Sequence, residues 1–111
     1  MVTKTADARI VLTTAGSADE AKRIGATLVE ERLAACATLV PAVESIYRWE
    51  GTVEIATETL LLIKTAADRV DALEARLKEL HSYQTPEFLV LPVESGSEGY
   101  LGWLGACLRE G

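Results

Sequence analysis

Residues 34–65, AACATLVPAVESIYRWEGTVEIATETLLLIKT, decide the fold, because they predict two long strands joined by a tight turn. In the second half, the alternate positions from Val53 to Ile63 are apolar or threonine, which is the two-residue period of a strand. The first half becomes rich in β-branched and aromatic residues towards Trp49. Between the halves, Glu50-Gly51 supplies a turn with a glycine that tolerates positive φ. We therefore predict a long central β-hairpin.

The length of this hairpin predicts assembly with other chains. Residues 34–49 would reach roughly 50 Å if fully extended at ~3.3 Å per residue. A compact chain of 111 residues has a radius of gyration of about 13 Å and hence a diameter near ~35 Å. The hairpin is thus expected to overhang its own domain, and an overhanging strand edge invites pairing with another chain. Pro41 lacks an N–H group and should mark an edge, a bulge or a break in the first strand.

The rest of the chain alternates between strand and helix patterns. A strand over Arg9–Thr13 precedes a helix that begins after Ser17, where Ser17 and Glu20 form a capping box, and that ends near Leu33. The elements expected after the hairpin are a helix opening around Asp68 as its N-cap, a loop over 82–87, a strand over 88–91, a loop over 95–99 and a final helix. This order predicts one α+β domain over residues 1–111, ferredoxin-like (β-α-β-β-α-β) with a C-terminal helix and a flexible N-terminus over residues 1–8.

Three predicted strands are continuous apolar runs instead of alternating ones. They are Ile10–Leu12, Leu60–Ile63 and Phe88–Leu91. Continuous runs indicate that both faces of the sheet are covered, whereas the two main helices of this arrangement cover only one. We expect another copy of the chain to cover the second face.

Composition limits the classes of function. The chain is 49% hydrophobic, enough for a real core, and its formal net charge of -6 argues against a nucleic-acid partner. No segment approaches the ~18 apolar residues of a membrane span, and the polar residues 1–8 lack the apolar core of a signal peptide. We expect a cytoplasmic protein without membrane contact, whose two cysteines are reduced.

Four short motifs resemble the CutA family, the divalent-cation tolerance proteins. They are ERLAAC at 31–36, SIYRWEG at 45–51, YQTPE at 83–87 and YLGWL at 100–104. The resemblance implies a ferredoxin-like fold, a homotrimer whose sheets pack inward, and an assembly similar to that of PII signalling proteins. It also implies a role in tolerance of copper and other divalent metals. No enzymatic reaction is implied, and the chain has no nucleophile elbow, phosphate loop or HExxH motif.

His81 is the only histidine and the first candidate metal ligand. It stands at the end of the second predicted helix, where a protonated imidazole also suits the helix dipole, so a purely structural role is the alternative. Some members of the family carry a cysteine where this chain has Thr13 and a second histidine where it has Leu80. We expect that no cofactor is required, and that Cu²⁺ or another divalent cation binds weakly, if at all, where assembly brings His81 near Glu87.

A second group of candidates surrounds the loop that follows this helix. Clefts between subunits are expected near Tyr83, Gln84, Thr85 and Glu87, with Lys64 either binding an anionic ligand or pairing with Glu58 or Glu87. Tyr47, Trp49 and Trp103 are candidates for the trimer interface. Two hypotheses result: a non-enzymatic trimer in divalent-metal tolerance, or a PII-like sensor of a small anionic metabolite in the clefts.

Overall fold

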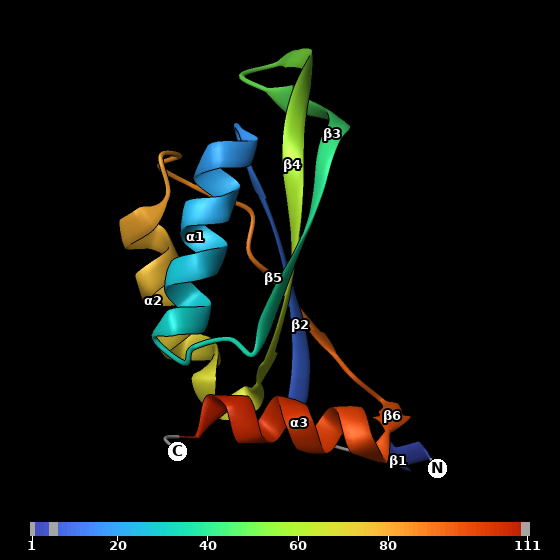
Figure 1. Cartoon of the computed structure of the whole chain (residues 1–111). Coiled ribbons are helices and arrows are strands. Elements are labelled where there is room, and N and C mark those ends of the chain that lie inside the picture. The colour runs from blue at the N-terminus through green and yellow to red at the C-terminus, as the bar shows by residue number, and fades with distance from the viewer. Residues whose placement is uncertain (1, 5–6, 110–111) are drawn as a thin grey trace.

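The computed structural model describes residues 2–4 and 7–109, and it has a mixed α+β fold with a four-stranded antiparallel sheet (Figure 1). The sheet order is β3-β4-β2-β5, formed by β2 (Ala8–Ala15), β3 (Cys36–Trp49), β4 (Thr52–Ala66) and β5 (Leu89–Pro92). Helices α1 (Ala18–Glu30) and α2 (Val70–Leu80) lie on the same side of the sheet, and α3 (Glu98–Leu108) crosses one end of it. A short 3₁₀ helix, η1 (Ala67–Arg69), leads into α2.

The predicted hairpin is confirmed. Glu50 and Gly51 have φ values of 49° and 81°, and a type I′ turn requires positive φ at both central positions. The register between β3 and β4 shifts between Val40 and Val43, which confirms the irregularity expected at Pro41. The outer half of the hairpin projects beyond the helices, and the Cα atoms extend over 46 × 25 × 22 Å. The molecule is elongated because this half of the hairpin has no helix beside it.

Helix α1 begins as predicted but ends earlier. The Ser17 hydroxyl accepts a hydrogen bond from the Glu20 N–H at 3.1 Å, which satisfies one of the unpaired donors of the first turn. The other half of the predicted capping box is wrong, because the Glu20 carboxylate accepts from Ser82 and from the backbone of Gly16, and no bond to it from the Ser17 N–H is found among the described residues. The helix stops at Glu30, where Arg32 takes a φ of 60° and reverses the chain, so it does not reach Leu33.

The remaining boundaries differ in small ways. Asp68 is not the N-cap of α2, because η1 occupies residues 67–69 and the helix begins at Val70. The loop expected over 95–99 holds strand β6 (Ser95–Ser97), which pairs with β1 (Val2–Lys4) in a second, two-stranded sheet. The N-terminus expected to be flexible over 1–8 therefore includes β1 and the start of β2, and its residues 1 and 5–6 lie outside the described part of the chain.

The core lies between the sheet and the two helices α1 and α2. Every second residue of β2 and β4 lies on the inner side of the sheet and points into the core. Helices α1 and α2 contribute the aliphatic side chains that face these residues. The large aliphatic residues with 0% exposure are Val11, Ile24, Leu28, Leu61, Ile63, Leu73 and Leu77. At ~1.5–3 kcal/mol for each fully buried aliphatic side chain, this cluster is the main stabilising term of the chain.

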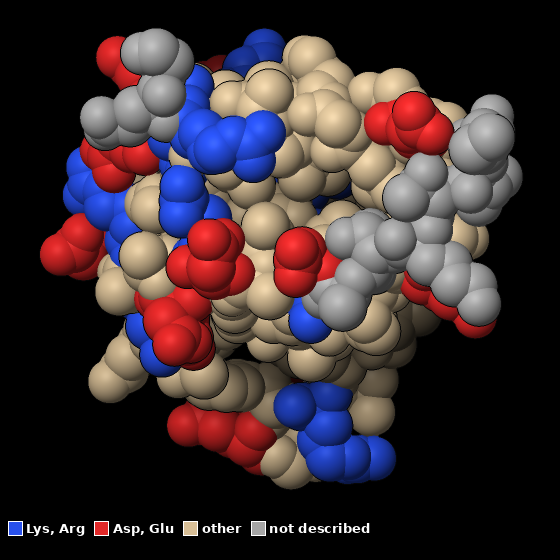
Figure 2. All heavy atoms as spheres, turned by 90° about the horizontal axis from the view of Figure 1, so that it is seen from below, with Lys and Arg blue, Asp and Glu red and all other residues tan. Residues whose placement is uncertain are grey.

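The opposite side of the sheet carries a second apolar surface. Strand register places Ile10 opposite Leu91 and Leu12 opposite both Leu89 and Leu62, and we call these five residues the outer sheet face. Leu89 and Leu91 are 54% and 44% exposed. Seen from the α3 end, charged side chains gather mainly on the side of α1 and α2, and uncharged residues cover most of the rest of the visible described surface (Figure 2). Within one chain, the second face of the sheet is left open to solvent.

Candidate functional site

A groove of about 730 Å³ lies between the projecting half of the hairpin and the loop that joins α2 to β5. Its volume falls within the ~300–1,000 Å³ typical of small-molecule sites. We call it the hairpin groove. Its lining residues are Thr14, Ser45, Ile46, Tyr47, Trp49, Glu58, Tyr83, Gln84, Thr85 and Glu87. Three separate segments therefore meet here: the end of β2, both strands of the hairpin, and the loop over 82–87.

His81 fixes the start of this loop from inside the protein. Its side chain is completely buried, with Nε2 2.7 Å from the carbonyl oxygen of Thr14 and Nδ1 accepting from the Tyr83 N–H at 3.0 Å. A carbonyl oxygen can only accept, so the ring proton is on Nε2 and the lone pair of Nδ1 faces the amide. Both ring nitrogens are therefore occupied by backbone groups. This geometry corresponds to the structural role considered for His81.

Glu20 makes a second attachment between the loop and α1. Its carboxylate accepts from the Ser82 N–H at 2.8 Å and from the Ser82 hydroxyl at 3.0 Å. Burial opposes ionisation of this carboxyl, but the backbone and side-chain hydrogen bonds from Ser82 outweigh burial, so the pKa of Glu20 lies below its usual value. The loop is held against the helix by an ionised group with little exposure.

Tyr83 connects the loop to the hairpin. Its hydroxyl donates to Oε2 of Glu58 at 2.7 Å, and its ring lies 4.7 Å from that of His81. Burial, together with the hydrogen bond to Glu58, raises the pKa of Tyr83 to about 12, so the phenol stays protonated at neutral pH. Gly16 leaves room for it, since a Cβ at this position would lie 3.3 Å from the Tyr83 hydroxyl oxygen. The result is a rigid wall of the groove.

The predicted metal ligands do not converge within one chain. Glu87 lines the hairpin groove, whereas His81 is buried behind the groove with both nitrogens in use. In the described part of the chain, no three or more His, Cys, Asp or Glu side chains are placed to hold a metal ion. One copy of these residues thus does not fit a divalent-cation site of ordinary coordination.

Lys64 and Trp103 lie away from the groove. Lys64 donates to the Thr38 hydroxyl at 2.5 Å, and its Nζ is 3.8 Å from Sγ of Cys36, so the expected ion pair with Glu58 or Glu87 is wrong within the chain. Trp103 is on α3 beside Tyr100, with ring centroids 5.4 Å apart. By contrast, the structure brings Tyr47 and Trp49 together with the predicted loop residues, Tyr83, Gln84, Thr85 and Glu87.

Sequence patterns missed several residues of the site. Glu58 appeared only as a partner for Lys64, and Glu20 only as a capping residue, yet the two carboxylates hold neighbouring residues at the start of the loop, Tyr83 and Ser82. The available signal for Glu58 was an acidic residue two positions before the apolar run Leu60–Ile63 of β4, because carboxylates are rarely buried without a partner. Thr14, Ser45 and Ile46 gave no comparable signal.

Comparison with known proteins places this architecture among known relatives. The family model described as "CutA1 divalent ion tolerance protein" matches residues 9–107. The divalent-cation tolerance protein CutA of Pectobacterium atrosepticum is 48% identical over 103 residues, which cover 93% of this chain and 94% of that protein.

Two solved structures are similar over nearly the whole fold. CutA from Synechococcus elongatus has a TM-score of 0.94 at 38% identity, with 98% of this chain and 96% of that chain covered. The periplasmic divalent cation tolerance protein CutA from Archaeoglobus fulgidus has a TM-score of 0.89 at 34% identity, with 92% and 99% covered. In this chain, none of the helices in the described part is both long and apolar enough to cross a membrane.

Proposed function

The chain belongs to the CutA1 divalent ion tolerance family, and from this premise we propose that it acts in tolerance of divalent cations as a non-enzymatic homotrimer. The outer sheet face carries the proposal. Leu89 and Leu91 are about half exposed in a single chain, and they continue an apolar surface through Ile10 and Leu12. Contiguous exposed apolar surface of this kind marks a protein–protein interface. A second and third copy packed on this face would bury it.

The sheet order supports the finer assignment of the fold. The order β3-β4-β2-β5, with α1 and α2 on one side, follows the β-α-β-β-α-β connection expected of a ferredoxin-like domain. The projecting hairpin supports a PII-like assembly, since its apolar residues Ile46, Val53 and Ile55 are 68%, 58% and 66% exposed within their own chain. Tyr47, Trp49 and Trp103 remain the aromatic candidates for this interface.

For the metal, we propose weak binding of Cu²⁺ or another divalent cation by groups from more than one copy, with no cofactor required for folding. Glu87 is the carboxylate that a neighbour could complete, because it lines the hairpin groove and is exposed. His81 would act from behind as a positioning residue for the loop. We propose that this activity takes place in the cytoplasm.

Two measurements test this proposal. Light scattering of the purified protein should give a mass near three times 12.0 kDa, and a stable monomer at micromolar concentration would rule the trimer out. Expression of the chain should also restore copper-resistant growth to a bacterium that lacks its own CutA, whereas the chain with Glu87→Gln should restore it less well. Equal rescue by both forms would remove Glu87 from the metal proposal.

The volume of the hairpin groove favours a second candidate, a PII-like sensor that binds a small metabolite between subunits. Calorimetry with Cu²⁺, Zn²⁺ and a panel of nucleotides separates the two. Copper binding weakened by Glu87→Gln supports the metal role. Nucleotide binding that is lost with Lys64→Ala supports an anion sensor whose site joins Lys64 of one copy to the groove of another.

A further inference from the structure

The lining of the hairpin groove combines aromatic rings with acidic side chains. Three of the six aromatic residues of the chain, Tyr47, Trp49 and Tyr83, line it together with the carboxylates of Glu58 and Glu87. None of the described residues that line the groove is a lysine or an arginine. We propose that the hairpin groove binds a small organic cation, a molecule with an ammonium group, held by aromatic faces and two carboxylates.

Glu58 provides the most specific observation. The residue is only 8% exposed, and it lines the groove. Its Oε2 accepts the hydroxyl of Tyr83, while its Oε1 has no hydrogen-bond partner among the described residues. Oε1 is not among the buried polar atoms that lack a partner in the described residues, so it is open to water in the groove. A donor or a positive charge from a ligand would take the place of that water.

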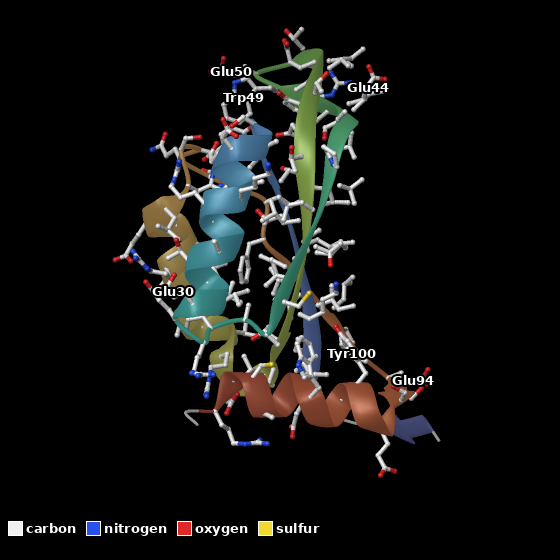
Figure 3. All side chains as sticks on the ribbon, in the orientation of Figure 1. Glu30, Glu44, Trp49, Glu50, Glu94 and Tyr100 are labelled. Carbon is white, nitrogen blue, oxygen red and sulfur yellow. The ribbon has the colours of Figure 1, made fainter. Side chains whose placement is uncertain are left out.

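The aromatic rings suit the same kind of ligand. Trp49 and Tyr47 are 61% and 44% exposed within one chain, and Trp49 lies near the hairpin tip above the N-terminal end of α1 (Figure 3). A ligand reaches the parts of these rings that a neighbouring copy does not cover. An ammonium group within ~6 Å of a ring centroid is attracted by the ring's quadrupole, most strongly for tryptophan. Tyr83 is fixed by its bond to Glu58, which presents a preorganised ring.

Charge distinguishes this ligand from an anion and from a bare metal ion. The lining carries two acidic groups and the chain has a net charge of -6, so both the groove and the net charge favour a cation over an anion. A divalent metal needs several ligand atoms converging at ~2.0–2.3 Å, which the described residues of one chain do not supply. An organic cation spreads its charge over a larger surface and needs no such convergence. The inference goes beyond the tolerance role and does not depend on it.

A matched pair of probes tests the charge directly. In a Trp103→Phe background, Trp49 is the only tryptophan, so its fluorescence reports on the groove. Choline should change this fluorescence saturably. Its uncharged counterpart of the same shape, 3,3-dimethylbutan-1-ol, should bind at least about tenfold more weakly, equivalent to ~1.4 kcal/mol. Equal binding of the two compounds would overturn the inference. The absence of a saturable change in fluorescence up to about 50 mM choline, a concentration in the range of weak ligands, would overturn it as well.

Two variants locate the site and one controls for charge alone. Glu58→Gln and Glu87→Gln should each weaken choline binding by about fivefold to tenfold. Glu54→Gln removes an exposed carboxylate of the same hairpin outside the groove lining and should change it less than about twofold. A similar loss in all three variants would point to general electrostatics and contradict a defined site. If Glu58→Gln does not fold, Glu87→Gln decides, because Glu87 is exposed.

The result also remains separable from the proposed function. Saturable Cu²⁺ binding, or a trimer mass, without choline binding overturns the organic-cation site and leaves the tolerance proposal standing. Choline binding by a chain that neither forms a trimer nor supports copper resistance overturns the tolerance proposal and leaves the organic-cation site standing. Stronger binding of adenosine monophosphate than of choline would assign the groove to an anion and would also overturn the inference.

Discussion

The two faces of the four-stranded sheet are built from the same strands and nearly the same residue types, yet only the inner face is covered by helices of the same chain. On the inner face, Leu61 and Ile63 are 0% exposed beneath α1 and α2. On the outer sheet face, one position away along the strand, Leu62 is half-buried, and Leu91 of β5 is 44% exposed. The difference lies in what covers each face. Residue type alone therefore does not predict burial within one chain, because burial depends on whether a second layer covers the face.

The largest effect is expected on the outer sheet face. Leu91→Glu places a charge on a surface that is proposed to be covered by another copy, where an unpaired buried charge costs several kcal/mol per site. We expect the mass measured by light scattering to fall from about three chains to one, 12.0 kDa. Val29→Glu is the control, because Val29 is exposed on α1, away from the sheet. An unchanged mass with Leu91→Glu would contradict the proposal that another copy covers the outer sheet face.

On the inner face, a truncation should affect the chain itself. Leu61→Ala removes a completely buried side chain, and we expect a loss of about 3 kcal/mol in the free energy of unfolding. Urea denaturation monitored by circular dichroism measures it. Val29→Ala, at an exposed helical position, should stay within about 0.5 kcal/mol. If the two substitutions cost the same, the inner face is not the core that its burial indicates.

A smaller effect is expected at Glu20, at the edge of the covered side. Glu20→Gln should cost about 1–2 kcal/mol at neutral pH, because it weakens charge-assisted bonds from Ser82. The folded pKa is lowered, so the stabilisation is present above the unfolded pKa, near 4.5, and is lost as pH falls through the lower folded pKa. Urea denaturation at pH 7 and at about pH 3, in the region of an ordinary carboxyl pKa, should show the difference shrink, whereas Glu30→Gln should show none.

The smallest effects distinguish two threonines of the inner face. Both are 0% exposed, but the Thr65 hydroxyl donates to Leu33 at 2.7 Å, whereas Oγ1 of Thr13 has no partner among the described residues. Thr65→Val should therefore lower the free energy of unfolding by about 1 kcal/mol, and Thr13→Val should raise it by up to about 1 kcal/mol. Thermal unfolding of the two variants side by side gives the signs. A loss with Thr13→Val would mean that its hydroxyl is satisfied in solution.

Much of the fold was predictable because its signals are local. The period of β4, the Glu50-Gly51 turn and the Ser17 cap each depend on residues within a few positions of one another. Pairing between distant short segments has no such signal, which is why β6 was expected to be a loop. The open outer sheet face was predictable only indirectly, from apolar runs that one layer of helices could not cover.

The candidate site was predictable in part for the same reason. The loop over 82–87 and the aromatic residues Tyr47 and Trp49 stood out by composition, and the structure brings them to one groove. What holds them there joins residues far apart in the chain: Glu20 bonds Ser82 across 62 positions, and Glu58 bonds Tyr83 across 25. The orientation of His81 likewise depends on a carbonyl group 67 positions away. Such contacts follow from the folded geometry and not from spacing.

The positions of the prolines in the sheet have a consequence for a single chain, whose outer sheet face is exposed. Two of the three prolines lie in the two edge strands, Pro41 in β3 and Pro92 in β5, and none lies in the central strands β2 and β4. A proline offers no N–H, and the shift beside Pro41 divides the long edge into two shorter segments. A newly made chain thus presents a poor template for fibre growth, and its refolding yield should depend on these two small interruptions more than its final stability does.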